Sequence, residues 1–501
     1  MLTGLHNKRY KKWAGVAMVA AFAGIPPAAL ADTIFADFTP GNLVVSRSVY
    51  AGTVASVKVG QKLPPNCPST AVCNAHGATN DGSYPGVWDN VTYDGSFTIT
   101  APIFLDQITP EGTRINTLSV PVNLVVTSFA SKSELALNLS REGDVVTFMG
   151  YVAPVNALDA SNSNTPGIID PTNPVGDAYY RGVVQVYASG AMELTITNAY
   201  SGNNGRAAIQ ANGYLYMVGN AGNGTGTPAD VSGSTGLQIA LPGQPSMPPT
   251  EVGDFSVANV TDPATGMPYP ADKPGKDNNF RGLTLFENNL YIAKGTGNNG
   301  IDTVYQVGDP HVMPTLGDAA TQPITILPGF PTTPVKAGSA GNPFGLWFGD
   351  AATLYVSDEG DGTVRNAETS QTAGLQKWIL VNGKWQFAYL MQNGLNLGQP
   401  YTVPDYPVAL SPFTDGLRNI TGRNNADGTV TIWAVTSTIS GSGDQGADPN
   451  KLVAITDVLS NADPSLASVE PFTTIMSAGF GEVLRGVSFT PGTGTRKRGR
   501  R

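Results

Sequence analysis

The sequence contains few charged residues, few histidines and only two cysteines. Charged residues make up 13% of its 501 residues, about half of the ~25% usual for soluble domains, so long helices with charged outer faces are not expected. The three histidines are His6, His76 and His311. They exclude a histidine-rich zinc centre and leave only His76 and His311 as bases for a Ser/His/Asp triad, because His6 lies at the start of the chain.

Several catalytic and cofactor-binding motifs are also missing. The sequence has no GxSxG, no CxxCH, no Walker loop, and no Rossmann fingerprint between a strand and a helix. Its net charge is −9, and nine of its 29 basic residues lie in residues 1–31 and 496–501. Because an acidic body repels nucleic acid, we expect no nucleic-acid partner.

Glycine and proline, in contrast, are abundant, with 59 and 38 residues. This composition is typical of short strands joined by turns. Apolar residues at 41% exclude wholesale disorder, and a chain of this length buries a core without metals or disulfides. The composition therefore predicts a large all-β domain.

Residues 1–31 have the pattern of a signal peptide. Four basic residues between positions 8 and 12 precede an apolar run over 14–30, and Ala29-Leu30-Ala31 fits a cleavage site. An uncleaved anchor helix is the alternative, although Pro26 and Pro27 interrupt the run. We predict a secreted or periplasmic protein with no transmembrane segment after cleavage.

The two cysteines, Cys67 and Cys73, lie six positions apart in a segment rich in Pro, Asn and Ser. In an oxidising compartment this spacing favours a disulfide that closes a small surface loop. A metal or redox site is the alternative, but the motif is not CxxC and only His76 is near.

A repeat runs through the chain. Residues 206–220, 281–295 and 344–358 share one template: a head residue, a small residue, an apolar strand, a turn, and then Leu-Tyr followed by two small or apolar residues. Looser copies occupy 133–151 and 418–435, and 485–492 supplies only the first strand of a sixth copy. A second hairpin follows each of the first; in the third copy we expect it to combine 236–241 with 254–259. Two hairpins make one four-stranded blade.

The missing strand of the sixth copy lies at the other end of the sequence. Residues 43–46 (Leu-Val-Val-Ser) match the Leu-Tyr-Val-Ser of 354–357. Pairing of the C-terminal strand with the N-terminal strands would close a ring, which leaves only short protected edges. We predict a six-bladed β-propeller as one domain over 32–491, preceded by a signal peptide at 1–31 and followed by a disordered basic tail at 492–501.

The head residues offer a candidate binding site, because the first strand of each blade lines the channel of a propeller. They are Ser133, Arg206, Arg281, Phe344, Arg418 and Arg485. Four guanidinium groups at one channel mouth would grip a carboxylate, sulfate or phosphate through bidentate hydrogen bonds. The alternative is structural: the arginines bind backbone carbonyls or acids of neighbouring blades. The two roles are not exclusive.

Two further candidates carry other chemistry. Asp358, Glu359 and Asp361 follow the strand at 354–357 on a glycine-rich turn, where three carboxylates suit calcium; a merely solvated turn is the alternative. His76, in the loop with the cysteines, is a candidate general base.

The repeat resembles the six-bladed propellers of the NHL-repeat and gluconolactonase-like superfamily over most of residues 41–491. The resemblance implies a fold shared by calcium-dependent lactonases, lyases and binding scaffolds, and fold alone does not choose among them. Lactonase-type members hold one metal in the channel with acidic and amide side chains. The resemblance makes Glu134, Asn138 and Asn419 the nearest equivalents, with Glu134 a catalytic candidate.

Two functions remain open. The first is an exported binding or interaction module, expected to be a monomer, that holds an anionic small molecule or glycan at the arginine-rich mouth. The alternative is a hydrolase or lyase acting on a lactone, ester or uronate, with calcium as a candidate cofactor.

Overall fold

The computed structural model describes residues 35–52, 62–63, 78–79, 99–226, 228–245, 248–295, 297–338, 341–439, 447–467 and 470–494. The predicted signal peptide, Cys67, Cys73, His76 and the end of the basic tail lie outside these residues. The chain divides into a unit over Met1–Phe35 and a compact unit over Ala36–Arg501.

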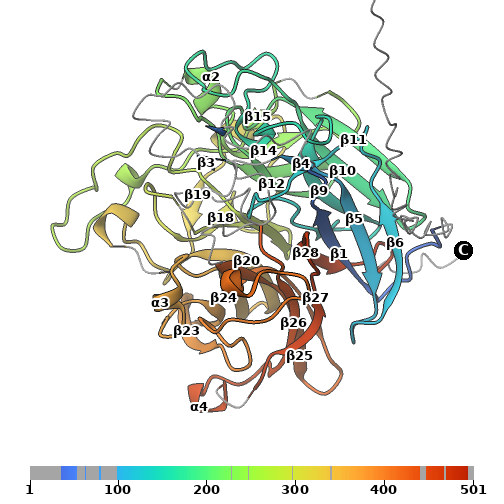
Figure 1. The fold of residues 1–501 in the computed structure, drawn as a ribbon. Helices are drawn as coiled ribbons and strands as arrows, with labels where there is room; N and C mark the ends of the chain where they lie inside the picture. The colour runs from blue at the N-terminus through green and yellow to red at the C-terminus, as the bar shows by residue number, and fades with distance from the viewer. Residues whose placement is uncertain are drawn as a thin grey trace, which may run out of the picture. The chain divides into compact units, whose positions relative to one another are not determined.

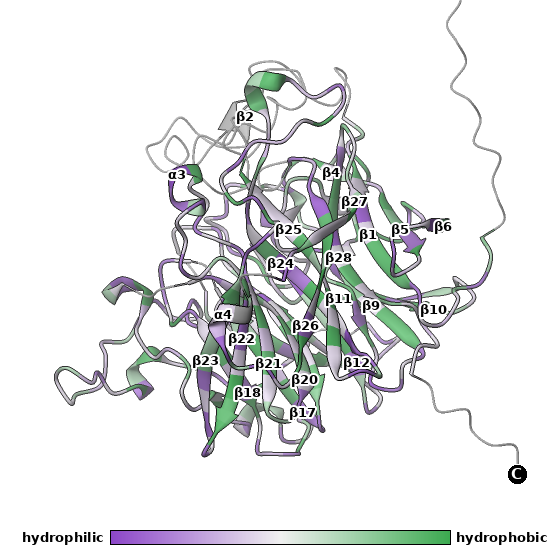
Figure 2. Cartoon of the chain, turned by 90° about the horizontal axis from the view of Figure 1, so that it is seen from below, coloured by the Kyte–Doolittle hydropathy of each residue, from purple (hydrophilic) through white to green (hydrophobic). Residues whose placement is uncertain are grey.

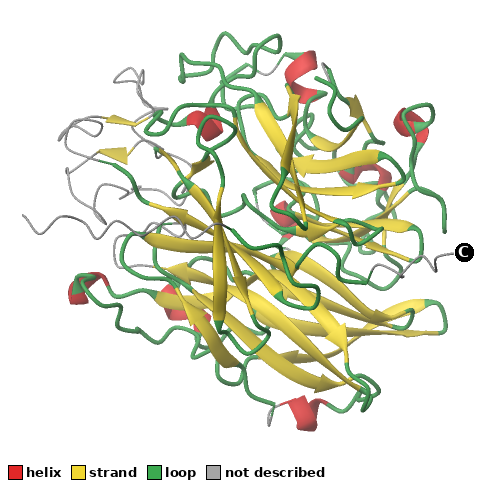
Figure 3. Ribbon diagram, turned by 90° about the vertical axis from the view of Figure 1, so that its right-hand side faces the viewer, coloured by secondary structure: helices red, strands yellow, loops and turns green. Residues whose placement is uncertain are grey.

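Within the described residues, strands form six four-stranded sheets, which are the blades of a β-propeller (Figures 1 and 3). From the inner strand outward, blade 1 contains β28 (Glu482–Phe489), β1 (Leu43–Val49), β5 (Ile103–Ile108) and β6 (Arg114–Ser119); blade 2 contains β8 (Asn138–Leu139), β9 (Val145–Tyr151), β10 (Arg181–Tyr187) and β11 (Met192–Thr197); and blade 3 contains β12 (Gly205–Ala211), β13 (Tyr214–Gly219), β14 (Gly236–Ala240) and β15 (Thr250–Glu251).

Blade 4 contains β16 (Gly282–Phe286), β17 (Asn289–Lys294), β18 (Thr303–Val307) and β19 (Ile324–Ile326); blade 5 contains β20 (Pro343–Asp350), β21 (Thr353–Asp358), β22 (Gly374–Val381) and β23 (Lys384–Met391); and blade 6 contains β24 (Phe413–Asn424), β25 (Thr429–Ile439), β26 (Lys451–Val458) and β27 (Thr473–Ser477). The inner strands contact one another in the order β8, β12, β16, β20, β24, β28 and back to β8. The inner strands therefore form a closed ring.

The remaining elements are short. Two-residue strands pair as β2 (Lys62–Leu63) with β3 (Ala78–Thr79) and as β4 (Thr100–Ala101) with β7 (Thr127–Ser128). Helical turns are α2 (Ala229–Ser232), α3 (Val364–Ala367), α4 (Pro464–Ala467), η2 (Ala160–Asn162), η3 (Val257–Asn259), η4 (Ala319–Thr321), η5 (Val335–Ala337) and η6 (Val408–Leu410). In this part of the chain, the helices are too short to span a bilayer.

The ring closes as the sequence predicts. β28 pairs antiparallel with β1, and Leu43, Val44 and Val45 lie opposite Phe489, Ser488 and Val487. In Figure 1 the red β28 lies beside the dark-blue β1. The six-bladed count and the all-β class are confirmed.

One strand of the third blade is placed differently. The sequence predicts it at 254–259, but the outer strand β15 is Thr250–Glu251, and Val257–Asn259 forms a 3-10 turn. The turn begins at Ser256, whose side chain accepts a hydrogen bond from Ala258 N. The capping serine diverts the backbone from the extended conformation that its apolar neighbours favour.

The apolar core lies in layers between neighbouring blades. Between blades 3 and 4, for example, Tyr216 and Ile239 pack in one buried cluster with Leu290 and Tyr305. Figure 2 shows the corresponding apolar stretches along the strands. Each sheet thus buries both faces against its neighbours, which requires the full ring.

The inner strands are not regular, because the head residues lie at β-bulges in β12, β20, β24 and β28. In β28, Arg485 and Gly486 together face Ser46, since Val45 pairs with Val487 and Arg47 with Leu484. A bulge leaves the N–H of the extra residue without a ladder partner. The side chain of Ser46 supplies that partner: Gly486 N donates to Ser46 Oγ at 2.8 Å.

The same serine also joins two blades. Ser46 Oγ donates to Leu135 O of blade 2 at 2.9 Å. Blade 5 repeats the arrangement: Gly345 N donates to Ser357 Oγ at 2.7 Å, and Ser357 Oγ donates to Arg418 O of blade 6. The serine that the two matching sequence segments share therefore accepts from the unpaired N–H of the bulge in its own blade. It also donates to a backbone carbonyl of the next blade.

Close approach of the inner strands explains the small residue that follows the head residue. A Cβ added to Gly345 would lie 2.6 Å from Arg418 O, and one added to Gly486 would overlap Leu135 O. Both obstacles are backbone atoms of the neighbouring blade, which cannot rotate away. Glycine is required there for steric reasons.

Replacing Gly486 with alanine is expected to lower the free energy of unfolding by about 1–3 kcal/mol, the usual effect of overpacking. Urea denaturation of both proteins measures the difference. Gly317→Ala is the control, because its nearest non-adjacent atom, Thr315 Oγ1, is 3.8 Å from the added Cβ. Equal losses in the two variants would contradict the steric explanation.

Candidate functional site

A cavity of about 480 Å³ occupies the end of the channel where the inner strands finish, opposite the head residues. It is called the channel cavity below. All six blades contribute to its lining through their inner strands or the turns beside them. A volume of this size lies within the range of small-molecule sites.

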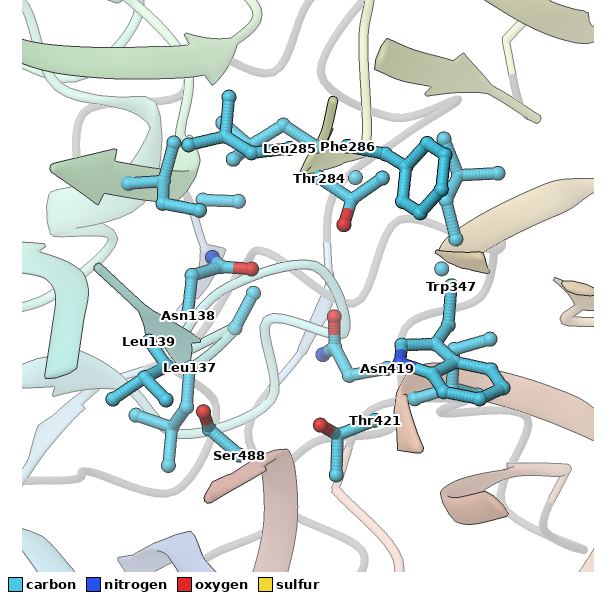
Figure 4. Close-up of a pocket in the computed structure, with 18 of the residues that line it drawn as sticks. Leu137, Asn138, Leu139, Thr284, Leu285, Phe286, Trp347, Asn419, Thr421 and Ser488 are labelled. Carbon is cyan, nitrogen blue, oxygen red and sulfur yellow. The ribbon is translucent and has the colours of Figure 1, made fainter. Parts of the chain in front are cut away.

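Neutral polar side chains point into the channel cavity. Figure 4 shows the amides of Asn138 and Asn419 and the hydroxyls of Thr284, Thr421 and Ser488 directed toward its middle. These groups come from blades 1, 2, 4 and 6. They provide both donors and acceptors of hydrogen bonds.

Neighbouring blades fix the orientation of the two amides. Asn138 Nδ2 donates to Ala208 O of blade 3 at 3.0 Å, and Asn419 Nδ2 donates to Arg485 O of blade 1 at 2.8 Å. Each amide thereby turns its carbonyl oxygen toward the cavity (Figure 4). The cavity presents two preoriented acceptors.

Aromatic rings form one side of the cavity. Trp347 packs over Gly422, where an added Cβ would lie 2.5 Å from the indole ring. Phe286 stacks on Phe348 with ring centroids 4.6 Å apart. At the exposed edge, Arg141 Nη1 donates to Asn288 Oδ1 at 2.6 Å.

The lining follows a register in the repeat. The residue three positions after each head residue lines the cavity; these residues are Ala136, Ile209, Thr284, Trp347, Thr421 and Ser488. Regular alternation would place residues two or four positions apart on one face. Where the head residue is bulged, the extra residue shifts that count to three. The sequence pattern singled out only the head residues, and these six lining residues differ too much in type to be recognised as one set.

The predicted arginines lie at the opposite end of the channel, where they hydrogen-bond to other groups of the chain. Arg206, Arg281, Arg418 and Arg485 are 2–6% exposed. Arg206 Nη1 donates to Phe280 O at 2.7 Å, Arg485 Nη2 to Phe129 O at 2.7 Å, and Arg281 Nη1 to Ser133 Oγ. The contact with Ser133 joins the heads of blades 4 and 2 across the channel.

Glu359 is the acid at this end that balances part of the positive charge. Arg418 Nε donates to Glu359 Oε2 at 3.0 Å, and Lys132 Nζ lies 3.7 Å from Oε1. Burial alone would raise the pKa of Glu359, but Lys132, Arg418 and Arg281 outweigh burial and lower it. In the sequence this residue is a candidate calcium ligand, and although pairing of the arginines with acids of neighbouring blades is one alternative there, Glu359 is not identified as the partner.

The other two acids of the predicted calcium site have separate partners. Asp358 accepts hydrogen bonds from Asn342 N and Gly360 N, at 2.7 and 3.0 Å. Asp361 accepts hydrogen bonds from Thr363 N and Asn366 Nδ2. Within the described residues, no group of three His, Cys, Asp or Glu is placed to hold a metal ion.

Glu134, the described catalytic candidate, is fully buried. It accepts hydrogen bonds from Tyr151 Oη, Thr127 Oγ1 and Ser128 N. Burial raises the pKa of Glu134 against the effect of these donors. The residue does not line the channel cavity.

The sequence matches no protein-family model and no curated protein. Similar solved structures include the parainfluenza virus 5 hemagglutinin-neuraminidase, at 11% identity over 72% of this chain and 84% of that one, with a TM-score of 0.34. The NanB sialidase of Streptococcus pneumoniae is 7% identical over 74% of this chain and 64% of that one, with a TM-score of 0.35. Likeness at this level does not indicate what this chain binds.

Asp415, near the head residue of blade 6, is expected to make stability depend on pH. Burial, then the charges of Asp361 and Glu359, raise its pKa to about 7, against a hydrogen bond from Gly362 N. The unfolded pKa is about 3.9, so the folded state holds an extra proton between about pH 4 and 7. The contribution of Asp415 to stability therefore falls as pH rises through this window and is constant above it.

Asp415→Asn should reduce the pH dependence of the free energy of unfolding. At pH 8 the variant should unfold at a higher urea concentration than wild type, and at pH 5 the difference should be smaller. Urea titrations at both pH values measure it. Glu111→Gln, which changes an exposed carboxyl, should follow wild type. An Asp415→Asn curve parallel to wild type would show that the carboxyl titrates normally.

Proposed function

We propose that this propeller binds an uncharged sugar, or another small molecule rich in hydroxyl groups, in the channel cavity. The observation that carries the proposal is the lining itself: two fixed amide acceptors, three hydroxyls and an indole ring around about 480 Å³. Sites of this kind combine apolar and aromatic walls with a few placed polar groups that fix orientation.

The orientation of the amides favours hydroxyl groups as ligands. Asn138 and Asn419 use their Nδ2 atoms on backbone carbonyls, so their Oδ1 atoms remain to accept from a ligand. The hydroxyls of Thr284, Thr421 and Ser488 both donate and accept. A sugar offers hydroxyls that do both, and its apolar ring face suits Trp347.

Binding is favoured over hydrolysis at this site. Glu287 is the one carboxylate among the described residues that line the channel cavity, and it is exposed on a turn. General acid catalysis relies on a carboxyl whose surroundings tune its pKa near the working pH. The hydrolase or lyase alternative stays a prediction.

The arginine-rich mouth stays a second, weaker candidate for an anion. Its four arginines are nearly buried and hydrogen-bonded to the protein, which supports the structural role. The resemblance to NHL-repeat propellers and export through the signal peptide stay predictions and are part of the proposal; with export, sugar binding would occur outside the cytoplasm.

The test is calorimetric titration of residues 32–501 with a panel of neutral mono- and disaccharides. A sugar that binds is then titrated into Trp347→Ala and the double variant Thr284→Val/Thr421→Val. Each is expected to weaken binding at least tenfold, because about 1.4 kcal/mol of lost contact corresponds to that factor.

Thr325→Val, on the outer strand β19 and exposed, is the matched control and should bind like wild type. Affinity that persists in both channel variants, or a panel in which only anions bind, would overturn the proposal.

A further inference from the structure

A second cavity, of about 500 Å³, opens beside the head residues over blades 4, 5 and 6. Its acids are Asp302 before β18, Asp361 after β21 and Asp415 in β24. Asn342 and Asn366 add amides, and Thr369, Ser370 and Thr372 add hydroxyls. Among the described residues that line it there is no lysine or arginine. It is called the acidic cavity below.

Asp415 supplies the observation that points to a ligand. Its side chain is buried, with the residue 3% exposed, yet it lines the acidic cavity. One oxygen, Oδ2, accepts from Gly362 N at 2.8 Å. The other, Oδ1, has no hydrogen-bond partner among the described residues. A buried oxygen of this kind lowers the stability of the fold unless a hydrogen-bond donor or a cation binds to it.

The cationic side chains near Asp415 form their recorded ion pairs with other acids and not with Asp415 Oδ1. Arg418, on the same strand as Asp415, bonds Glu359 through Nε. Lys294 Nζ bonds Asp302 Oδ1 at 2.8 Å. The charges of Asp361 and Glu359 add to burial in raising the pKa of Asp415, so a positive group beside Oδ1 would be attracted.

We propose that the acidic cavity binds an organic ammonium group, with Asp415 Oδ1 as its main acceptor. An ammonium carries three N–H donors, and Asp361 and the amide oxygens of the lining offer further acceptors. The volume exceeds what a bare ion needs and leaves room for the carbon chain of an amine.

A divalent cation fits the acidic cavity less well. Calcium takes six to eight oxygen ligands, and no group of three His, Cys, Asp or Glu in the described residues is placed to hold a metal. Each oxygen of Asp361 accepts one hydrogen bond, from Thr363 N or from Asn366 Nδ2, and keeps a second lone pair for an N–H donor. An ammonium needs fewer acceptors and tolerates this geometry.

The experiment titrates residues 32–501 with 1,5-diaminopentane and, separately, with 1,5-pentanediol and with calcium chloride, all at constant ionic strength. The diamine should bind and the diol, its neutral isostere, should not. Asp415→Asn and Asp361→Asn should each weaken diamine binding at least tenfold. Asp361 is exposed, so its variant tests the site even where Asp415→Asn perturbs folding. Asp350→Asn, which changes the exposed last residue of β20, is the matched control.

Protonation of Asp415 gives a second readout. Because burial and neighbouring acids raise its pKa to about 7, the diamine should bind about tenfold more weakly for each pH unit below 7 and equally at pH 8 and 9. Asp361 and Glu359 are the other acids that face Asp415, and Arg418 is the facing base. Asp415→Asn should remove the slope.

The proposal would be overturned if the diamine did not bind to wild type or if the diol bound equally well. Unchanged diamine affinity in Asp361→Asn and Asp415→Asn would also overturn it. So would calcium that displaces the diamine from the wild type and not from the variants. The channel variants Trp347→Ala and Thr284→Val/Thr421→Val should bind the diamine normally, so failure here is distinguishable from failure of the sugar proposal.

Discussion

The closed ring depends on close packing between neighbouring inner strands, and in blades 1 and 5 this packing is set by a bulge at the head residue that a serine holds. In blade 1, Ser46 accepts from the N–H of Gly486 and donates to Leu135 O. Ser357 does the same between Gly345 and Arg418 O. Because the hydroxyl both accepts and donates, one side chain satisfies the bulge and sets the distance to the neighbouring strand. Glycine is needed where that distance leaves no room for a Cβ.

The bulge also gives the channel two different ends. It brings the head residue and the third residue after it onto the channel face, so Arg418 lies at one end and Thr421 at the other. At the head end, charged groups are buried and must be paired, as Arg418 is with Glu359. At the other end, neutral side chains point toward the middle of the channel cavity, and the charged Arg141 and Glu287 lie at its exposed edge. A single ring of strands thus supports a buried charged end and an open cavity lined mainly by neutral side chains.

The acidic cavity arises mostly from loops, and the inner strand β24 contributes Asp415. Asp302, Asp361 and Asp415 come from connections or strand starts in three successive blades. Their charges are compensated only in part, since Lys294 bonds Asp302 while Asp415 keeps one oxygen without a protein partner among the described residues. Loops that a rigid scaffold positions are where binding residues commonly occur.

The sequence by itself determined the all-β class, the six blades and the pairing of β28 with β1, because hairpin spacing and alternation are local patterns that repeat. It also placed Asn138 and Asn419 near a channel site through the resemblance. Only the tertiary structure decided that Glu359 pairs with Arg418, that four arginines are buried, and that Thr284, Trp347, Thr421 and Ser488 share one cavity. These outcomes depend on bulges and on contacts between residues 59 or more positions apart, as Glu359 and Arg418 are, and such contacts leave no periodic trace in the sequence.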